Sequence, residues 1–441
     1  MRLTSPATMR RYGQLHVAEE VQILDLDVQT RCGHRGNSST YVAKGDVCFS
    51  RSSLDDILSA MVIVVPCKDE ELHVIWGVIA AIPAPCVVLL VSNCRRATTR
   101  DNKEGKEGEE EDQYTQLVEM SRTFGAFGRQ VLTIHQKDPA AAAALRESGM
   151  SQLLDSADKR VTRNGKGEGM VLGIALAEAF YPQKRYIGFV DADNFNPCSV
   201  GEYCQAFAAG FAMSRRPEYE DTIVRLKWSS KPKVRTGGTI EFVPEGRCSR
   251  IVNAWLNRLF VPSLGGAQPR ETARPFITTG NAGEHAMTMA LARKLRLAAG
   301  YAIEPFHFVD LLVRGCLDGG ISMQRLDKPV VVRQVRTLSP HYHRESDDEH
   351  IRKMWAAGLG SIYHGLSPYC AEGGPILKLC EDMRAYAVNH NGIDKATGEL
   401  PCPRIYPPVQ TMNIRRFRDV LESSIGKGSF HAFGLSDDVE D

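Results

Sequence analysis

Two aspartates stand one residue apart at the end of an apolar run near the middle of the chain. Asp191 and Asp193 follow the segment RYIGFV, residues 185–190, which we expect to be a buried strand. Like charges this close destabilise each other unless a cation lies between them. Carboxylate oxygens suit Mg²⁺ or Mn²⁺, and such a metal is usually shared with a substrate phosphate. The alternative is that the pair only forms a turn or a helix cap.

Polar residues also follow the first two of the other expected strands, residues 61–66 and 86–93. Open α/β sheets bind their ligands at the carboxyl ends of the strands. The residues at these two ends are Pro66, Lys68, Asp69, Glu70, Ser92 and Asn93. They are candidates for lining a ligand cleft, although a stretch of this kind also caps helices.

Two glycine-containing loops are candidates for binding anions. The first, TRNGKGEGM at residues 162–170, brings Arg163 and Lys166 to the start of an expected helix. The second, FITTGNAGEHAMT at residues 276–288, is expected to enter a helix at Glu284. Exposed backbone N–H groups at a helix start favour phosphate or carboxylate. The first loop lacks the Walker A spacing, and a flexible surface turn is its alternative.

Two histidines, His341 and His343, alternate in the segment TLSPHYHRE. On an extended segment this spacing puts both imidazoles on one face, so either one is able to complete a metal site begun by the aspartates.

The order of the apolar segments predicts the fold class. Continuous β-branched runs separated by helix-period segments are typical of a mostly parallel sheet with helices on both faces, an α/β fold. We expect an N-terminal extension over residues 1–55, a catalytic domain over 56–345 and a smaller helical C-terminal lobe over 346–441. The acidic segment at 100–113 has the composition of a disordered insertion.

Composition excludes several classes of protein. The formal net charge of the 441 residues is +1, which argues against a nucleic-acid-binding protein. The 12 cysteines form no CxxC pair, and no apolar run is long enough to span a membrane. The N-terminus has no apolar core of a secretory signal. We therefore expect a soluble, cytoplasmic protein.

Eight motifs together resemble the mannosyl-3-phosphoglycerate synthase family. In chain order they are PCKDEELH, LLVSN, HQKDP, GKGEGM, GFVDADN, TGNAGEHAMT, YAIEPF and PHYH. The resemblance implies a retaining glycosyltransferase of the GT-A fold. It also implies transfer of mannose from GDP-mannose to 3-phospho-D-glycerate, with a divalent metal (Mg²⁺, or else Mn²⁺ or Co²⁺) and a homodimer as the expected assembly. The product is the precursor of mannosylglycerate, a compatible solute.

The resemblance further implies roles for individual residues. The expected donor-binding residues are Pro66, Lys68, Glu70, Ser92, Asn93, Gln136, Lys166, Gly167 and Asp191. The expected acceptor-binding residues are Arg163, Thr279, Gly280, Asn281 and Ala282. Asp193 is expected to bind the metal together with His341 or His343, with His341 slightly favoured. Asp191, Asp193 and Glu284 are the expected catalytic residues, with Glu284 as a helper.

Three other functions compete with this interpretation. A related enzyme with another donor, such as a glucosyl-3-phosphoglycerate synthase using GDP-glucose or UDP-glucose, differs in ways that one sequence does not reveal. A phosphatase of the haloacid dehalogenase type also uses a D-x-D motif, but Phe195 stands where that motif expects Thr or Val. A catalytically silent nucleotide-binding protein is disfavoured because metal, donor and acceptor candidates occur together.

Overall fold

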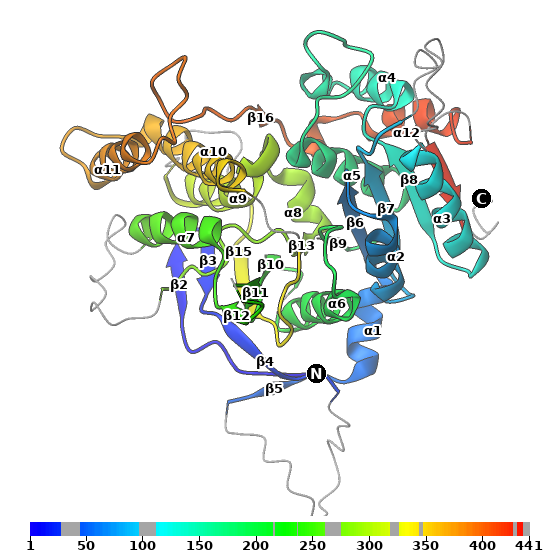
Figure 1. The fold of residues 1–441 in the computed structure, drawn as a ribbon, viewed down its shortest axis with the longest axis horizontal. Coiled ribbons are helices and arrows are strands. Elements are labelled where there is room, and N and C mark those ends of the chain that lie inside the picture. Colours follow the sequence, from blue (N-terminus) through cyan, green and yellow to red (C-terminus); the bar gives the residue numbers. More distant parts are fainter. Residues whose placement is uncertain are drawn as a thin grey trace, which may run out of the picture.

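A mixed, mainly parallel β-sheet with helices on both faces forms the body of the protein (Figure 1). The computed structural model describes residues 1–27, 45–96, 112–214, 217–235, 237–260, 275–317, 326–343, 347–426 and 430–434. The order of strands across the sheet is β17-β8-β7-β6-β9-β13-β10-β15-β4-β1-β5; β3 also pairs with β15, and β2 pairs with β3. This architecture confirms the predicted α/β class.

The sheet strands are β1 (Arg2–Leu3), β2 (Met9–Tyr12), β3 (Leu15–Ala18), β4 (Val21–Asp25), β5 (Val47–Cys48), β6 (Met61–Cys67), β7 (Val87–Ser92), β8 (Val131–His135), β9 (Tyr186–Phe189), β10 (Asp221–Lys227), β13 (His285–Thr288), β15 (Val330–Arg336) and β17 (Phe430–Phe433). Two smaller pairs are β11 (Lys231–Val234) with β12 (Ile240–Val243), and β14 (Leu297–Ala298) with β16 (Ile405–Tyr406). The helices are α1 (Arg51–Ser59), α2 (Leu72–Ala81), α3 (Gln113–Ala126), α4 (Pro139–Glu147), α5 (Lys166–Phe180), α6 (Pro197–Ala212), α7 (Arg247–Phe260), α8 (Met289–Lys294), α9 (Ile303–Leu312), α10 (Asp348–Leu366), α11 (Pro375–Asn389) and α12 (Ile414–Glu422).

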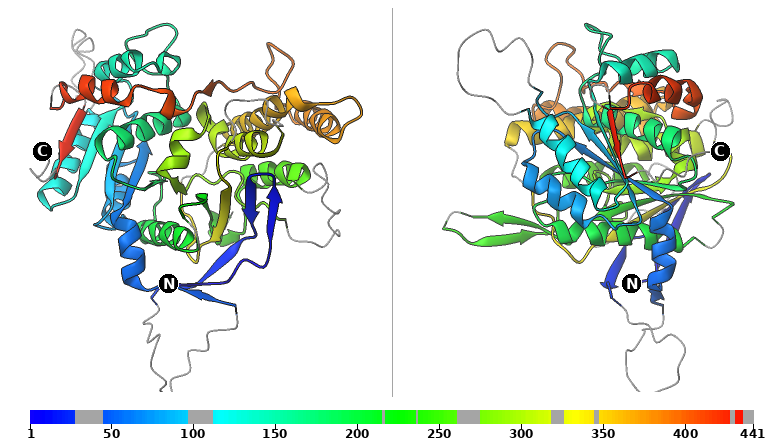
Figure 2. Two further views of the ribbon diagram at one scale, coloured as in Figure 1. Left: turned by 180° about the vertical axis from the view of Figure 1, so that it is seen from behind. Right: turned by 90° about the vertical axis from the view of Figure 1, so that its right-hand side faces the viewer.

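Strand β6 shows why a continuous apolar run forms a central strand. Val62 and Val64 pack into one hydrophobic cluster, whereas Ile63 and Val65 pack into the other. Successive side chains of a strand point to opposite faces, so both faces of β6 need apolar residues. Helix α5 covers the first face and helices α2 and α6 cover the second, as Figure 2 also shows. Because β6 is parallel to β7 and β9, its carboxyl end lies beside theirs.

The expectation of a helix from Glu284 onward is wrong. His285–Thr288 is strand β13, which pairs antiparallel with β9 and β10 in the middle of the sheet. Helix α8 begins only at Met289, and the hydroxyl of Thr288 caps it by accepting from Leu291 N–H. A short apolar run is compatible with a helix or with a strand, and here hydrogen bonding to two neighbouring strands favours the strand.

The acidic segment 100–113 lies outside the described residues except for its last two. Asp112 is the N-cap of α3, where its carboxylate accepts from Tyr114 N–H and Thr115 N–H, and Gln113 begins the helix. Both residues therefore belong to a helix start and not to an insertion.

Both ends of the chain contribute strands to the central sheet. At one end β3 and β4 pair with β15, and at the other β17 pairs with β8. Helix α12 packs against α4 and α5, far along the sheet from α10 and α11. The division into three parts stays a prediction. None of the helices within the described ranges combines the length and apolarity that crossing a membrane requires.

Candidate active site

A cleft of about 620 Å³ opens at the carboxyl ends of β6 and β9. It brings together residues that are far apart in the sequence. The predicted residues that line it are Pro66, Lys68, Glu70, Asn93, Gln136, Lys166, Asp191, Asp193, Asn281, His341 and His343. A second, open hollow of about 590 Å³ adjoins it, shares Lys68 and Asn93, and adds the cations Arg95, Arg96 and Lys137. The cleft thus lies at the carboxyl ends of parallel strands, where the sequence predicts that ligands bind.

The donor-side loops are held together by amide side chains. Gln136 donates from Nε2 to the carbonyl oxygens of Arg163 (2.7 Å) and Gly165 (3.1 Å), which fixes the loop before α5. Asn93 Nδ2 donates to Asn164 Oδ1. The backbone N–H of Lys68 donates to Glu70 Oε2 at 2.6 Å, and burial raises the pKa of Glu70.

Two predicted donor residues are buried in the framework of the cleft. Ser92 is fully buried, and its carbonyl oxygen accepts from Gln136 N–H at 2.6 Å. Gly167 packs so tightly that an added Cβ would lie 2.2 Å from the Ala298 carbonyl oxygen. Both residues position the loops and do not themselves line the cleft.

Lys166, the first residue of α5, forms ion pairs with two carboxylates. Its Nζ lies 2.7 Å from Asp191 Oδ1 and 2.9 Å from Glu304 Oε1. Burial alone would lower the pKa of Lys166, but the two carboxylates hold it well above its ordinary value. Gly283 leaves room for Asp191, because an added Cβ there would lie 2.3 Å from Asp191 Oδ2. Asp191 is therefore already ion-paired with a lysine, which it shares with Glu304.

Asp193 has a carboxylate that the protein leaves only partly bound. Oδ1 is buried without a hydrogen-bond partner among the described residues, and Oδ2 lies 3.9 Å from His343 Nδ1. Burial, followed by the nearby Asp191, raises the pKa of Asp193 to about 7. An orphaned carboxylate oxygen beside an imidazole fits a divalent metal. Within the described ranges no three His, Cys, Asp or Glu side chains form a complete metal cluster, so substrate oxygens and water would have to supply the other ligands.

The two predicted histidines have different surroundings. His341 is buried and stacked on Trp228 with ring centroids 4.0 Å apart, and its Nδ1 lies 3.3 Å from the Tyr203 hydroxyl. His343 Nε2 lies 2.9 Å from Lys231 Nζ, while its Nδ1 faces Asp193. Of the two rings it is His343 that faces Asp193, whereas the sequence slightly favoured His341 as the metal ligand.

Glu284 lies behind the cleft. It is fully buried, and neither carboxylate oxygen has a hydrogen-bond partner among the described residues. Its Oε1 is 4.0 Å from His341 Nδ1. Burial, reinforced by Asp191, raises the pKa of Glu284 to about 8. Because Glu284 does not line the cleft, its place fits support of His341 better than contact with a substrate.

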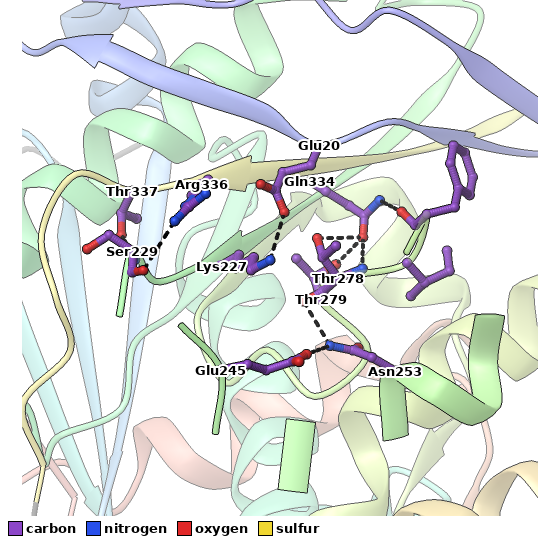
Figure 3. A network of polar contacts seen from close by, with 12 residues as sticks. Glu20, Lys227, Ser229, Glu245, Asn253, Thr278, Thr279, Gln334, Arg336 and Thr337 are labelled. Atoms are coloured by element: carbon purple, nitrogen blue, oxygen red, sulfur yellow. Dashed lines mark hydrogen bonds and ion pairs between the residues drawn. The ribbon is translucent and has the colours of Figure 1, made fainter. Parts of the chain in front are cut away.

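The turn from Thr279 to Gly283, which we call the acceptor turn, enters the other side of the cleft. Asn281 lines both the cleft and a smaller neighbouring cavity, which Thr279 and Ala282 also line. Figure 3 shows the support behind it: Thr279 Oγ1 and Thr278 N–H both donate to Gln334 Oε1. An added Cβ on Gly280 would lie 2.4 Å from Leu256 Cδ1. Thr279 and Gly280 thus fix the turn, and Asn281 faces the ligand space.

Arg163 lies apart from this turn. Its Nε donates to the Gln152 carbonyl oxygen at 3.4 Å, and its side chain does not line the cleft. The cations that line the cleft with Asn281 are instead Lys231 and Arg247, and Lys231 also lines the smaller cavity. The sequence reasoning missed both, together with Trp228, Ser249, Tyr301 and Glu304. Of these residues, only Glu304 could have been found from the sequence, because it stands in the motif YAIEPF.

Comparisons with known proteins support one family. The family model described as mannosyl-3-phosphoglycerate synthase matches residues 5–421. The chain is similar to the mannosyl-3-phosphoglycerate synthase of Pyrococcus furiosus, with 34% identity over 96% of this chain and 98% of the relative. It is also similar to that of Aeropyrum pernix, with 32% identity over 82% of this chain and 85% of the relative.

Solved structures of glucosyl-3-phosphoglycerate synthase from Mycobacterium tuberculosis are more distant. The complex with Mn²⁺, UDP and glucosyl-3-phosphoglycerate has 17% identity and a TM-score of 0.43, covering 71% of this chain and 83% of that one. The complex with UDP has 16% identity and a TM-score of 0.45, and the match covers 82% of this chain and 96% of that one. The sequence matches over nearly the whole chain show that it belongs to the mannosyl-3-phosphoglycerate synthase family.

Proposed function

We propose that the protein transfers mannose from GDP-mannose to 3-phospho-D-glycerate with retention of configuration, giving 2-(α-D-mannosyl)-3-phosphoglycerate. Family membership supports the reaction. The observation that carries it in the structure is the single cleft in which the Lys166–Asp191 pair, the Asp193–His343 pair and the acceptor turn meet.

Asp193 and His343 would hold the divalent metal, Mg²⁺ or a similar ion. A bound metal ion supplies Lewis-acid stabilisation of the negative charge that develops on a diphosphate leaving group. The partly unpartnered carboxylate of Asp193 is the feature that fits this role, while Asp191 is already ion-paired with Lys166.

The start of α5 lies where the donor diphosphate is proposed to bind. Lys166 is held by two carboxylates, so its ammonium group has a fixed position before substrate arrives. Fixed donors aimed at developing charge contribute more than mobile ones, because they need no reorganisation during the reaction. The N-terminal N–H groups of a helix add to the same field.

The acceptor is proposed to lie between Asn281 and the cations Lys231 and Arg247, which would bind its carboxylate and phosphate. Burial lowers the pKa of Lys231 to about 8, so its ammonium form still predominates at neutral pH. With the acceptor on the same face as the leaving group, the departing phosphate oxygen is able to take the proton of the attacking hydroxyl. Retention then needs no protein base.

The test is an assay of the purified protein with Mg²⁺, GDP-mannose and 3-phosphoglycerate, in which GDP release and the mass of the product are measured together. We expect one GDP for each mannosyl-3-phosphoglycerate formed, and none without acceptor. Phosphate release from mannosyl-3-phosphoglycerate in the absence of GDP-mannose would instead identify a phosphatase. Faster transfer from UDP-glucose or GDP-glucose would identify the glucosyl alternative.

A further inference from the structure

Arg225 is a fully buried arginine in the middle of the sheet, behind the acceptor turn. It lies on β10, opposite His285 of β13 on one side and Gln334 of β15 on the other. Its Nε donates to the Thr279 carbonyl oxygen at 2.9 Å, and its Nη2 lies 3.4 Å from that of Gly280. The side chain therefore holds two consecutive carbonyl groups of the turn from behind.

The other partners of Arg225 are neutral as well. Nη2 donates to the backbone carbonyl of Glu304 at 3.1 Å, Nη1 donates to His307 Nδ1 at 3.0 Å, and the guanidinium lies over the ring of Phe308. Among the described residues no carboxylate oxygen comes within ion-pair distance of this guanidinium. Burial lowers the pKa of Arg225 to about 10, so the group stays charged at neutral pH.

Other buried arginines of this protein differ in that respect. Arg333, also on the sheet, lies 3.4 Å from Glu220, and Arg314 lies 3.1 Å from Asp310. Burying a charge without a counter-ion is costly, and proteins usually avoid it by pairing. Arg225 has no carboxylate within ion-pair distance among the described residues, so we look for the reason for its burial in the site and not in folding.

The geometry of the peptide bond links Arg225 to the site. In a trans peptide the carbonyl and the following N–H point in opposite directions. Because Arg225 holds the carbonyl of Gly280, the N–H of Asn281 points away from Arg225, and Asn281 lines the cleft together with Gly283 of the same turn. The same turn is held by Asn253, which accepts from Gly280 N–H at 2.7 Å and donates to the Thr278 carbonyl at 3.1 Å.

Arg225 also connects the two sides of the cleft. Its bond to the Glu304 carbonyl fixes the start of α9, and the Glu304 carboxylate holds Lys166 on the donor side. A single side chain thus anchors the acceptor turn and the first turn of the helix that supports the donor lysine.

We propose that Arg225 is a positioning residue for the acceptor: it presets the Thr279–Gly283 turn, and its positive charge, which has no carboxylate within ion-pair distance among the described residues, favours an acceptor that carries both a carboxylate and a phosphate. This inference rests on the proposed function for the identity of the acceptor.

The test compares Arg225→Met with Arg225→Lys and with Arg333→Met, a matched buried arginine that has its own carboxylate. For each variant we would measure KM for 3-phosphoglycerate, kcat and the Kd for GDP by calorimetry. Arg225→Met should raise KM for 3-phosphoglycerate at least about tenfold, since charge-assisted hydrogen bonds are lost, while the Kd for GDP changes less than about twofold. Arg225→Lys should restore part of the loss, and Arg333→Met should leave KM unchanged.

Measurements with a second acceptor distinguish the effect of the acceptor's charge from the effect of the shape of the turn. With glycerol 3-phosphate, which lacks the carboxylate, the binding penalty of Arg225→Met measured by calorimetry should be smaller than with 3-phosphoglycerate. An unchanged KM in Arg225→Met, or an equal loss of GDP affinity, would overturn the proposal. If that variant does not fold, Arg225→Lys decides by the same two quantities. If the wild-type protein forms no mannosyl product, the proposed function is wrong, and calorimetry with 3-phosphoglycerate still tests the role of Arg225.

Discussion

The two sides of the cleft are built in different ways. The donor side is formed by short segments directly after β6, β7 and β9, and several of its side chains are open to solvent; those of Lys68 and Asp69 are 60% and 57% exposed. The acceptor side is one turn whose supporting side chains are buried, with Gln334 at 0% and Asn253 at 3% exposure.

This difference predicts how each side tolerates change. Where a side chain is exposed, water replaces a lost hydrogen bond at little cost. Where the partners are buried, removing one leaves the other unsatisfied, which costs about 1–3 kcal/mol. We therefore expect substitutions on the proposed donor side, other than those of Lys166 and Asp193, to reduce activity only modestly. Substitutions of the buried residues on the proposed acceptor side should reduce it more strongly. Four experiments test this comparison.

The largest effect should come from Asp193→Ala, at the charged centre that both sides share. Its carboxylate is the proposed metal ligand, and removal of one preorganised electrostatic group typically costs about 10²- to 10³-fold in rate. We expect at least that loss in kcat at saturating Mg²⁺. Asp158→Ala removes an exposed carboxylate paired with Arg160 and serves as the control. Near-normal turnover of Asp193→Ala would contradict the assignment.

The next largest effect should come from Lys166→Met. Without the ammonium group, Asp191 and Glu304 lose the cation with which both are ion-paired. We expect kcat/KM for GDP-mannose to fall about a hundredfold, because a fixed positive group near the diphosphate is lost together with its field. Lys184→Met, which removes a lysine bound to the Ser59 carbonyl outside the cleft, should leave this ratio unchanged. An equal change of kcat/KM in both variants would contradict the proposed role of Lys166 in donor binding.

A paired experiment contrasts the two sides directly. Gln334→Met keeps the size of the side chain but removes its bonds to Thr278 and Thr279, so KM for 3-phosphoglycerate should rise about tenfold. Asn93→Ala, on the donor side, should raise KM for GDP-mannose only about two- to fivefold, because water replaces the amide. Steady-state kinetics with each substrate varied in turn measures both. A larger effect from Asn93→Ala would reverse the comparison.

The smallest effect should follow deletion of residues 100–111 with a short Gly-Ser replacement. The segment is rich in glutamate and glycine, a composition typical of a solvated insertion. Activity and thermal unfolding should match those of the full-length protein. Loss of activity in a folded deletion variant would show that the segment takes part in the site.

The same contrast explains what the sequence revealed. Pro66, Asn93 and Asp191 follow apolar runs within one or two residues, so the rule that parallel strands present ligands at their carboxyl ends was enough to group them. The acceptor turn was found as a glycine-rich motif, but its supports were not. Arg225 and Gln334 stand 54 and 55 residues from Thr279, and only the register of β10 and β15 brings them behind it.

Two other misses have local causes. The strand His285–Thr288 was taken for a helix because a short apolar run has no decisive period. Lys231 and Arg247 were missed because nothing in their neighbours marks them; they reach the cleft through the β11–β12 pair and the start of α7. The metal-binding preference between His341 and His343 depends on which ring faces Asp193, and the sequence spacing carries no information on that.

One competition experiment tests the central claim that this cleft joins a mannosyl donor to 3-phosphoglycerate. The protein is given equal concentrations of GDP-mannose, GDP-glucose and UDP-glucose with 3-phosphoglycerate and Mg²⁺, and the product is identified by nuclear magnetic resonance. We predict one main product in which mannose is α-linked to O2 of 3-phosphoglycerate. A glucosyl product, a β-linkage, or consumption of sugar nucleotide without transfer would contradict the account.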